Sequence, residues 1–160
     1  MPMSPPPVVI VLAAGRGSRF RGASHKLSQP LGGGTVLGRT VGHAIASGLP
    51  VVVVTTPLLE PEVAGWVAAR DTVIVPEVRH PPSGELGMGY SIAAGVTARA
   101  DAGGWLVLPG DLPLVRPDTL RRVAAGLAQH PVVYAQHRGR RGHPVGFAAE
   151  LFPELIALKG

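Results

Sequence analysis

Five apolar runs rich in β-branched residues recur along the chain, and glycine or proline residues bound them. The runs are Val8–Ala13, Val51–Thr55, Thr72–Val75, Trp105–Leu108 and Val132–Ala135. Polar residues do not alternate with apolar ones inside these runs, so both faces of each segment are expected to be buried. The pattern therefore predicts strands of a sheet that is covered on both sides.

Helical spacing lies between the runs. One apolar face predicts a helix that stops at Gly48, because glycine is typical of the position after a helix end. Its members are Val36, Leu37, Val41, Ala44 and Ile45. Pro117 suits the first turn of another helix, and weaker helical patterns cover Glu62–Arg70 and Tyr90–Ala100. Alternating strands and helices predict a single α/β domain of three layers with a mainly parallel sheet.

Composition narrows the class of protein. The 160 residues include 22 glycines and 17 prolines, but 46% are hydrophobic, which indicates a folded domain rather than a disordered chain. The absence of cysteine excludes disulfides, thiolate zinc sites and cysteine nucleophiles. The apolar runs are too short to span a membrane and no positive segment precedes the first one. A cytoplasmic domain without a membrane partner is therefore expected.

The net charge is positive and is carried mainly by arginine. Lys+Arg 15 exceeds Asp+Glu 10, giving +5, and only Lys26 and Lys159 are lysines. The planar guanidinium group matches phosphate oxygens, so the excess suits an anionic small ligand or nucleic acid. Aromatic residues make up only 4%, which argues against a module that stacks RNA bases, and no nucleic-acid partner is expected.

The loop after the first run is rich in glycine and positive charge, and ligands of such sheets bind at the carboxyl ends of the strands. Its cations are Arg16, Arg19, Arg21 and Lys26. Small residues let the backbone approach an anion and turn its N–H groups toward it. The P-loop pattern fails because Ala23 stands where lysine is required, and the dinucleotide pattern fails at Phe20. The loop predicts an anion site of another kind, with a basic loop that binds nothing as the alternative.

A second loop places a carboxylate directly after an apolar strand. Asp111 follows Gly110 at the end of the fourth run, whereas Asp71, Asp101 and Asp118 occupy ordinary turn or helix-start positions. Magnesium binds through one or two carboxylates together with substrate phosphates, so one aspartate beside an anion loop is sufficient to recruit it. A turn in which Asp111 only caps the strand is the alternative.

Two further segments carry candidate ligand contacts. Glycines 84, 87 and 89 precede or open a helix, whose N-terminus favours negative charge; alternatively, they only permit close packing of the helix on the sheet. The segment 138–147 joins two strand-like runs and contains Gly-His-Pro-Val at 142–145 beside several arginines. A solvated charged hairpin or a nucleic-acid patch is the alternative there.

A family resemblance begins in the first loop. Its sequence Leu-Ala-Ala-Gly-Arg-Gly, followed by Arg19 and Lys26, resembles the signature of the nucleotidyltransferases that make molybdenum cofactor dinucleotides. It also resembles the wider sugar-phosphate and methylerythritol cytidylyltransferases. The Gly-Asp-x-Pro pattern at Asp111 is similar to the metal-binding motif of this family. Gly-His-Pro-Val resembles the branch that transfers cytidylyl groups to molybdopterin. The resemblance extends from Val8 to Gly160 and implies a Rossmann-like nucleotidyltransferase fold.

The resemblance also implies a role for each matching residue. Arg19 and Lys26 would bind the phosphates and act in catalysis together with Asp111, the expected Mg²⁺ ligand. His143 and Pro144 would help to form the pocket for the acceptor. The nucleotide would be held by Leu12, Ala13, Ala14, Gly15, Arg16, Gly17, Gly89, Ser91 and Gly110.

The reaction implied is Mg²⁺-dependent transfer of CMP from CTP to the terminal phosphate of a molybdopterin-type acceptor, with release of pyrophosphate. CTP is favoured over GTP because the first loop reads Ala-Ala-Gly rather than Ala-Gly-Gly. A molybdoenzyme would be a further partner. Transfer of GMP or CMP to another phosphorylated acceptor, or a non-catalytic nucleotide-binding accessory protein for a molybdoenzyme, are the alternatives. Family members continue past the position of Gly160 with a further metal-site carboxylate, so a shortened C-terminus is expected and the activity of this chain stays open.

Overall fold

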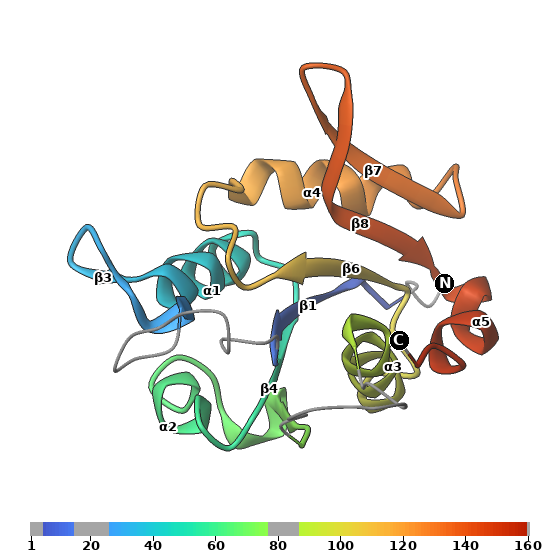
Figure 1. The fold of residues 1–160 in the computed structure, drawn as a ribbon. Coiled ribbons are helices and arrows are strands. Elements are labelled where there is room, and N and C mark those ends of the chain that lie inside the picture. The colour runs from blue at the N-terminus through green and yellow to red at the C-terminus, as the bar shows by residue number, and fades with distance from the viewer. Residues whose placement is uncertain (1–4, 15–25, 77–86, 160) are drawn as a thin grey trace.

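The fold is built on one six-stranded sheet in the order β5-β4-β1-β6-β8-β7 (Figure 1). This computed structural model describes residues 5–14, 26–76 and 87–159. The strands of the sheet are β1 Val8–Ala13, β4 Val51–Thr55, β5 Thr72–Ile74, β6 Gly104–Pro109, β7 Val132–His137 and β8 Arg140–Ala148. Among them β8 alone runs against the others, since it pairs antiparallel with both β6 and β7 while the remaining pairs are parallel. The predicted mainly parallel sheet is confirmed.

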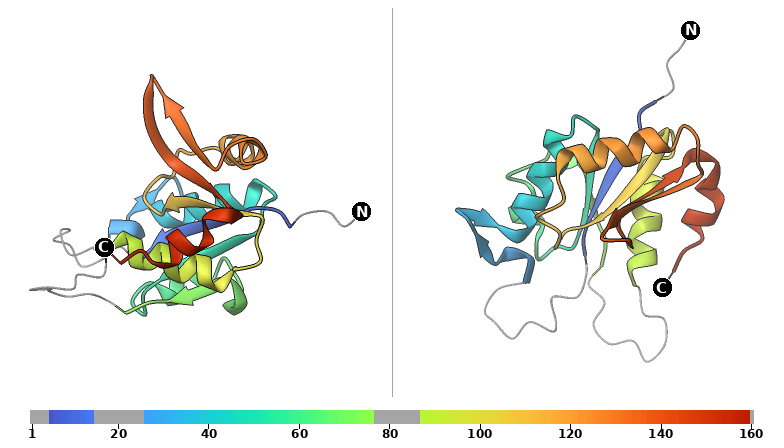
Figure 2. Two further views of the ribbon diagram at one scale, coloured as in Figure 1. Left: turned by 90° about the vertical axis from the view of Figure 1, so that its right-hand side faces the viewer. Right: turned by 90° about the horizontal axis from the view of Figure 1, so that it is seen from above.

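Helices cover both faces of this sheet. They are α1 Val36–Ala46, α2 Glu60–Val63, α3 Met88–Ala98, α4 Pro117–Gly126 and α5 Phe152–Ile156. Figures 1 and 2 show α1 and α4 on one side of the central strands and α3 and α5 on the other. Along β1, Val9 and Val11 pack toward α1, α2 and α4, whereas Ile10 packs toward α3 and α5. The run is apolar throughout because successive side chains face two different cores, and the three-layer α/β prediction is confirmed.

Most predicted elements lie within two residues of the observed ones. The first two strands match in full, and the predicted helix end at Gly48 is confirmed by its positive φ of 83° directly after the C-cap Ser47. The remaining elements are short: β2 Pro30–Leu31, β3 Gly34–Thr35, and the 3₁₀ turns Lys26–Ser28, Ala69–Asp71 and Ala149–Leu151.

Two predictions about elements are wrong. The helix expected over Glu62–Arg70 ends at Val63, and the chain continues through turns to a 3₁₀ turn at Ala69–Asp71. The Trp66 ring lies against α1 here, so tertiary packing overrides the local helical pattern. The segment 138–147 is no mere connection, because β8 begins at Arg140 and forms a hairpin with β7. Pro144 inside the segment argued against a strand there, since proline is rare in strands.

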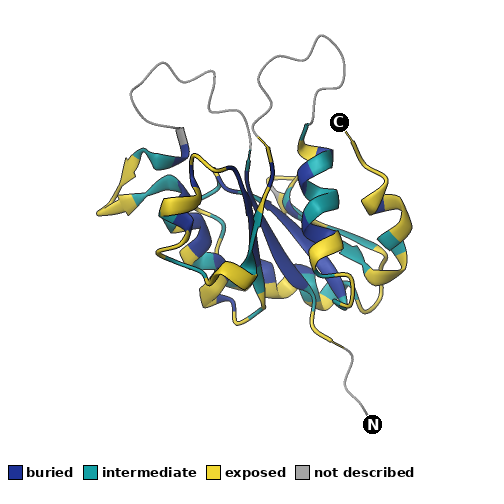
Figure 3. Ribbon diagram, turned by 90° about the horizontal axis from the view of Figure 1, so that it is seen from below, coloured by how far each residue is buried: buried dark blue, intermediate teal, exposed yellow. Residues whose placement is uncertain are grey.

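The strand directions bring the loops of interest to one edge. Strands β1, β4, β5, β6 and β7 all end at the same edge of the sheet, which we call the carboxyl edge. Helix α3 runs back across the sheet, so its first turn lies at this edge as well, as Figure 3 shows for the buried strands and the start of the helix. Among the helices of the described ranges, none is long and apolar enough to cross a membrane.

Candidate functional site

The loops that follow β1 and β6 begin side by side at the carboxyl edge. The backbone N–H of Gly110, directly after β6, donates to the carbonyl oxygen of Leu12 near the end of β1, at 2.8 Å. A Cβ at Gly110 would lie 2.9 Å from that same oxygen, so only glycine permits this approach. Leu12 and Ala13 are buried and Ala14 is half-buried. The fold therefore places the end of β1, from which the predicted anion loop continues, next to the predicted metal ligand.

Asp111 is exposed at this edge, immediately after the buried Gly110. In the part of the chain that the structure describes, no group of three or more histidine or acidic side chains could hold a metal ion. A carboxylate at the end of a strand suits magnesium, which keeps most of its coordination for water and substrate phosphates. The donor set at Asp111 therefore fits an ion that binds together with a nucleotide.

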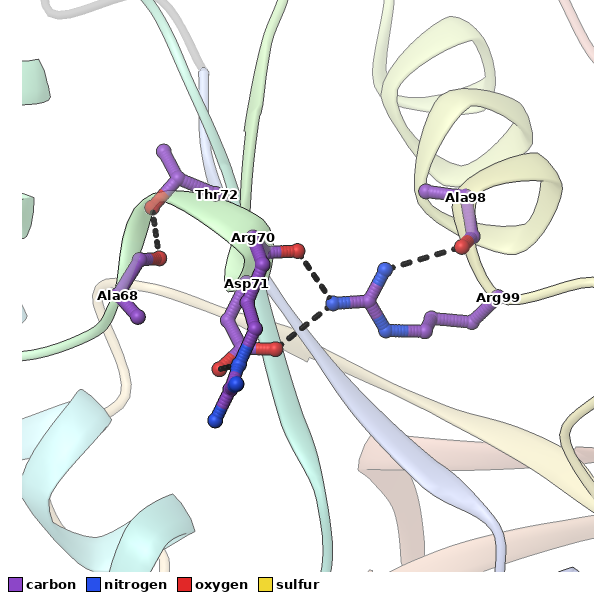
Figure 4. Close-up of polar contacts among 6 residues, drawn as sticks. All are labelled: Ala68, Arg70, Asp71, Thr72, Ala98 and Arg99. Carbon is purple, nitrogen blue, oxygen red and sulfur yellow. Dashed lines mark hydrogen bonds and ion pairs between the residues drawn. The ribbon is translucent and has the colours of Figure 1, made fainter.

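Two other aspartates form ion pairs with arginines. Asp118 opens α4 and its Oδ2 lies 3.0 Å from Nε of Arg122. Asp71 lies at the start of β5, where its Oδ1 is 2.7 Å from Nη2 of Arg99 (Figure 4). The same nitrogen donates to the Arg70 carbonyl oxygen at 2.6 Å. The two contacts of Arg99 tie the C-terminal end of α3 to the beginning of β5, at the edge opposite Asp111.

The first turn of α3 brings small residues to the carboxyl edge. Gly87 is the N-cap residue, and Gly89 and Ser91 in the first turn are buried. The unpaired N–H groups and the positive dipole end of a helix of this length favour an anion. The Gly87 N–H donates to the carbonyl oxygen of Lys159 at 3.3 Å, so the C-terminal residues also reach this edge. The structure thus brings two of the predicted nucleotide contacts, Gly89 and Ser91, to the carboxyl edge.

His143 and Pro144 lie where the pairing of the β7–β8 hairpin changes register. Tyr134 pairs with Val145 and the next residue, Ala135, pairs with Gly142, which leaves His143 and Pro144 without partners on β7. His143 is half-buried and Pro144 is buried. Beyond this point the two strands form a ribbon that stands out from the body (Figure 2, left).

The ribbon carries exposed positive charge. Its arginines are Arg138, Arg140 and Arg141. The guanidinium carbon of Arg141 lies 5.0 Å from the centre of the Tyr134 ring, a cation–π distance. Since β7 ends and β8 begins at the carboxyl edge, this charge is attached to the same edge as Asp111.

Several predicted residues lie outside the described ranges. These are Gly15, Arg16, Gly17 and Arg19. Lys26 begins the 3₁₀ turn Lys26–Ser28, and its backbone alone is described. The placement of the phosphate-binding side chains therefore stays a prediction.

Sequence reasoning missed two polar contacts at this edge. The buried Thr55 hydroxyl, at the end of β4, donates to the Ala13 carbonyl oxygen at 3.2 Å. The change from four valines to Thr55 and Thr56 could have indicated that the strand ends there with polar side chains. In the second contact Ser28 Oγ donates to Glu62 Oε1 at 2.6 Å and ties the turn after Lys26 to α2. Among the described residues the buried Glu62 Oε2 has no hydrogen-bond partner, and nothing in the local sequence indicated this long-range contact.

A three-layer α/β domain that brings the end of β1, Asp111 and the N-terminus of α3 to one carboxyl edge has a Rossmann-like architecture. The chain belongs to the MobA-like NTP transferase domain family, whose sequence profile matches residues 9–160.

Similar proteins support this family. The chain is 38% identical over 124 residues to the bifunctional protein GlmU of Halorhodospira halophila, covering 78% of this chain and 25% of that protein. It thus spans about a quarter of the length of the curated relatives it matches. Among solved structures it is similar to Rv0371c from Mycobacterium tuberculosis H37Rv, with a TM-score of 0.78, 26% identity, and coverage of 99% of this chain and 79% of that one.

Two further structures add to the comparison. The structure of Rv0371c in complex with manganese gives a TM-score of 0.73 at 26% identity, covering 99% of this chain and 78% of the other. A nucleotidyl transferase from Methanothermobacter thermautotroptrophicus, Mth528, gives a TM-score of 0.68 at 30% identity, covering 97% and 77%.

Proposed function

We propose that this chain is a nucleotidyltransferase domain that transfers CMP from CTP to the terminal phosphate of a molybdopterin-type acceptor and releases pyrophosphate. The observation that carries the proposal is the Gly110–Leu12 hydrogen bond, which joins the end of β1 to the start of the segment that carries Asp111, in a chain of the MobA-like NTP transferase family. It supports a site in which a phosphate-binding loop would continue from the end of β1, next to a carboxylate suited to a nucleotide-bound metal ion.

The nucleotide half of the site comes from the first loop and α3. Residues Leu12 to Gly17, with Gly110, would surround the base and the triphosphate, and Gly89 and Ser91 would contact the base and ribose. Arg19 and Lys26 would neutralise the phosphates and steady the departing pyrophosphate. Support comes from the buried position of Leu12, Gly89 and Ser91 at the carboxyl edge.

In the transfer, an oxygen of the acceptor phosphate forms a bond to the α-phosphorus of CTP. The bond between that phosphorus and the oxygen bridging to the β-phosphate breaks, and its electron pair leaves with pyrophosphate. The attacking phosphate is already anionic, so no general base is required and the protein contributes mainly position and charge. Asp111 would hold a divalent ion, which when bound neutralises charge that develops on the phosphate oxygens. The manganese complex of Rv0371c supports a divalent ion at this fold.

The acceptor half of the site would lie along the β7–β8 hairpin. His143 and Pro144 interrupt its pairing at the carboxyl edge, and the arginines of the ribbon supply charge for an anionic acceptor. The resemblance of the first loop to the wider sugar-phosphate cytidylyltransferases favours a second candidate, transfer to a different phosphorylated acceptor such as a sugar phosphate. The nucleotide half of the mechanism is the same in both.

The test is pyrophosphate release from CTP or GTP, with Mg²⁺ or Mn²⁺, and with molybdopterin or a sugar 1-phosphate as acceptor. We expect release from CTP with molybdopterin, and a loss of about 100-fold or more in Asp111→Asn, the scale of removing one preorganised electrostatic contact to a transition state. Asp101→Asn is the matched control, since Asp101 is exposed in the turn before β6, at the opposite edge.

The other outcomes separate the alternatives. Release with a sugar 1-phosphate but not with molybdopterin would favour the second candidate. Nucleotide binding without release for every acceptor would indicate a non-catalytic accessory protein. Full metal-dependent transfer by Asp111→Asn would exclude Asp111 as the metal ligand.

A further inference from the structure

We infer that Thr40 and His43 of α1 are positioning residues that hold the loop carrying Asp111 at its two ends. Thr40 Oγ1 donates to the Gly110 carbonyl oxygen at 2.8 Å. His43 Nδ1 lies 3.0 Å from the Val115 carbonyl oxygen. The catalytic consequence of this pair of contacts, which we call the α1 clamp, rests on the proposed role of Asp111.

The Thr40 contact acts directly on the peptide that precedes Asp111. The carbonyl that Thr40 binds belongs to the planar peptide unit joining Gly110 to Asp111, so fixing that oxygen fixes the plane from which Asp111 extends. The N–H of Gly110 is held independently by Leu12 at 2.8 Å. A strand on one side and a helix on the other thus hold the two polar groups of Gly110.

Burial makes the Thr40 contact consequential. Thr40 is fully buried, and its hydroxyl also lies 3.0 Å from the Val36 carbonyl oxygen one turn earlier. A hydroxyl has one proton to donate, and the Val36 oxygen is already the i−4 acceptor position for a backbone N–H of the helix. The shorter contact, to Gly110, is therefore the one whose loss would leave a buried carbonyl short of a donor.

The second contact holds the far end of the loop. His43 follows Thr40 by three residues, so both side chains lie on the same face of α1. The Val115 oxygen can only accept, so Nδ1 of the half-buried His43 carries the proton in this contact. The residues between Gly110 and Val115 form neither helix nor strand, and Leu114 among them is 87% exposed. Contacts to α1 at both ends therefore restrict a loop that has no regular structure of its own.

The experiment compares matched pairs of variants. Thr40→Val keeps the shape and removes the hydroxyl, whereas Thr40→Ser keeps the hydroxyl. His43→Leu removes the donor, whereas His43→Asn places an amide nitrogen where Nδ1 lies. The first readout is the Mn²⁺ concentration that half-saturates the protein with CTP present, measured by electron paramagnetic resonance, with nucleotide affinity in EDTA as the reference.

We expect Thr40→Val and His43→Leu to raise the half-saturating Mn²⁺ concentration by about 10- to 100-fold, the usual effect of removing a partner behind a metal ligand. Nucleotide affinity in EDTA should change little, and Thr40→Ser and His43→Asn should restore the wild-type value. A merely structural role would lower the melting temperature of the variants and leave the Mn²⁺ dependence unchanged. That result would overturn the inference, as would equal behaviour of Thr40→Val and Thr40→Ser.

A second readout separates the α1 clamp from the proposed function. In the metal-free protein, the N–H groups of Gly110 and Val115 are bonded to the carbonyl oxygens of Leu12 and Leu112, so their amide hydrogen exchange reports opening of the two loop ends. Releasing the clamped carbonyl at each end should ease that opening, and exchange at Gly110 and Val115 should accelerate by up to about tenfold in Thr40→Val and His43→Leu, respectively, the scale of losing one hydrogen bond. If the wild type binds no Mn²⁺ and releases no pyrophosphate, the proposed function fails while exchange still decides the α1 clamp. Unchanged exchange in both variants would overturn the α1 clamp whatever the activity. His43→Leu keeps the test decisive if Thr40→Val does not fold, because His43 is only half-buried.

Discussion

Replacing Gly95 by alanine should destabilise the protein, although glycine is a poor residue for the middle of a helix. Gly95 lies on the face of α3 that packs on β1 and β4. A Cβ there would be 2.8 Å from Ile10 Cγ2, 3.1 Å from Val54 Cγ2 and 3.2 Å from Ile10 Cδ1. Ile10 and Val54 are fully buried in the central strands. The added methyl group therefore meets two side chains that have no free space beside them.

Two opposing effects determine the size of the change. Alanine in place of glycine inside a helix stabilises by about 0.5–1 kcal/mol. Inserting a methylene-sized group into a packed core costs about 1–3 kcal/mol. The closest contact would be roughly 1 Å below the optimal carbon–carbon separation, and both neighbours are β-branched and stiff at χ1. The cost should thus fall in the upper half of its range, for a net loss of about 1–2 kcal/mol.

The assay is urea unfolding of the wild type, Gly95→Ala and Gly42→Ala. Gly42 is exposed on α1, and a Cβ there would meet nothing within 4 Å. Gly42→Ala should therefore show the helix-propensity gain alone, about 0.5–1 kcal/mol of added stability. For a chain of this size the Gly95→Ala loss corresponds to a melting temperature lower by about 2–8 °C. If Gly95→Ala were as stable as the wild type or more so, the close packing of α3 on β1 and β4 would be refuted.

Three further outcomes are expected. Asp71→Asn should cost about 1 kcal/mol in unfolding free energy, since its ion pair is partly exposed, and should leave pyrophosphate release per folded molecule unchanged. Arg140→Glu with Arg141→Glu should raise the KM for an anionic acceptor, most strongly at low salt, and leave the KM for the nucleotide unchanged; equal effects on both would exclude an acceptor role for the ribbon. Ser28→Ala should cost about 1.5–3 kcal/mol, because it leaves a largely buried carboxylate without its donor. The double variant with Glu62→Leu should recover most of that loss in urea unfolding, and a full loss in the double variant would contradict this account.

The sequence was sufficient for the layers of the fold because each central strand faces two cores. Val8–Ala13 and Val51–Thr55 are apolar at every position or nearly so, and burial on both faces is what such a run requires. Gly48 was predictable from local geometry, since its positive φ follows from a helix end that any helix of this kind needs. Burial patterns and local steric rules were thus enough to predict the layers of the fold and the end of α1.

The elements that were predicted wrongly depend on contacts between residues that are far apart in the sequence. The helical pattern after Glu62 gives way to turns where Trp66 lies against α1. Strand β8 contains Pro144 and exposed arginines, and it exists because β6 and β7 supply hydrogen bonds on its two sides. Neither partner is visible in a window of local sequence, so periodicity alone could not identify this strand.

The candidate site likewise contains one residue that local sequence identifies and others that it does not. Asp111 could be singled out because an aspartate directly after a buried strand is a local signal. Its supporting contacts could not, since Thr40 and His43 are about 70 residues from the carbonyl groups they bind. Hydrogen bonds of this kind follow from how α1 packs against the end of β6, which no motif in either segment encodes.

A high number of glycines in a segment overstates the evidence for ligand binding, because packing alone can require glycine. Gly110 lies in a loop that the sequence marks for ligand contact, and Gly95 lies in the helix whose N-terminal end carries the glycines at 87 and 89, yet at each the space of a Cβ is already occupied by protein atoms. Ile10 and Val54 occupy it at Gly95, and Leu37 with the Leu12 carbonyl oxygen occupies it at Gly110. Packing alone therefore explains why glycine is required at both positions, and no ligand is needed to explain it. At Gly110 the same packing also fixes where the next residue lies, because the close approach to β1 is what places Asp111 beside the end of that strand.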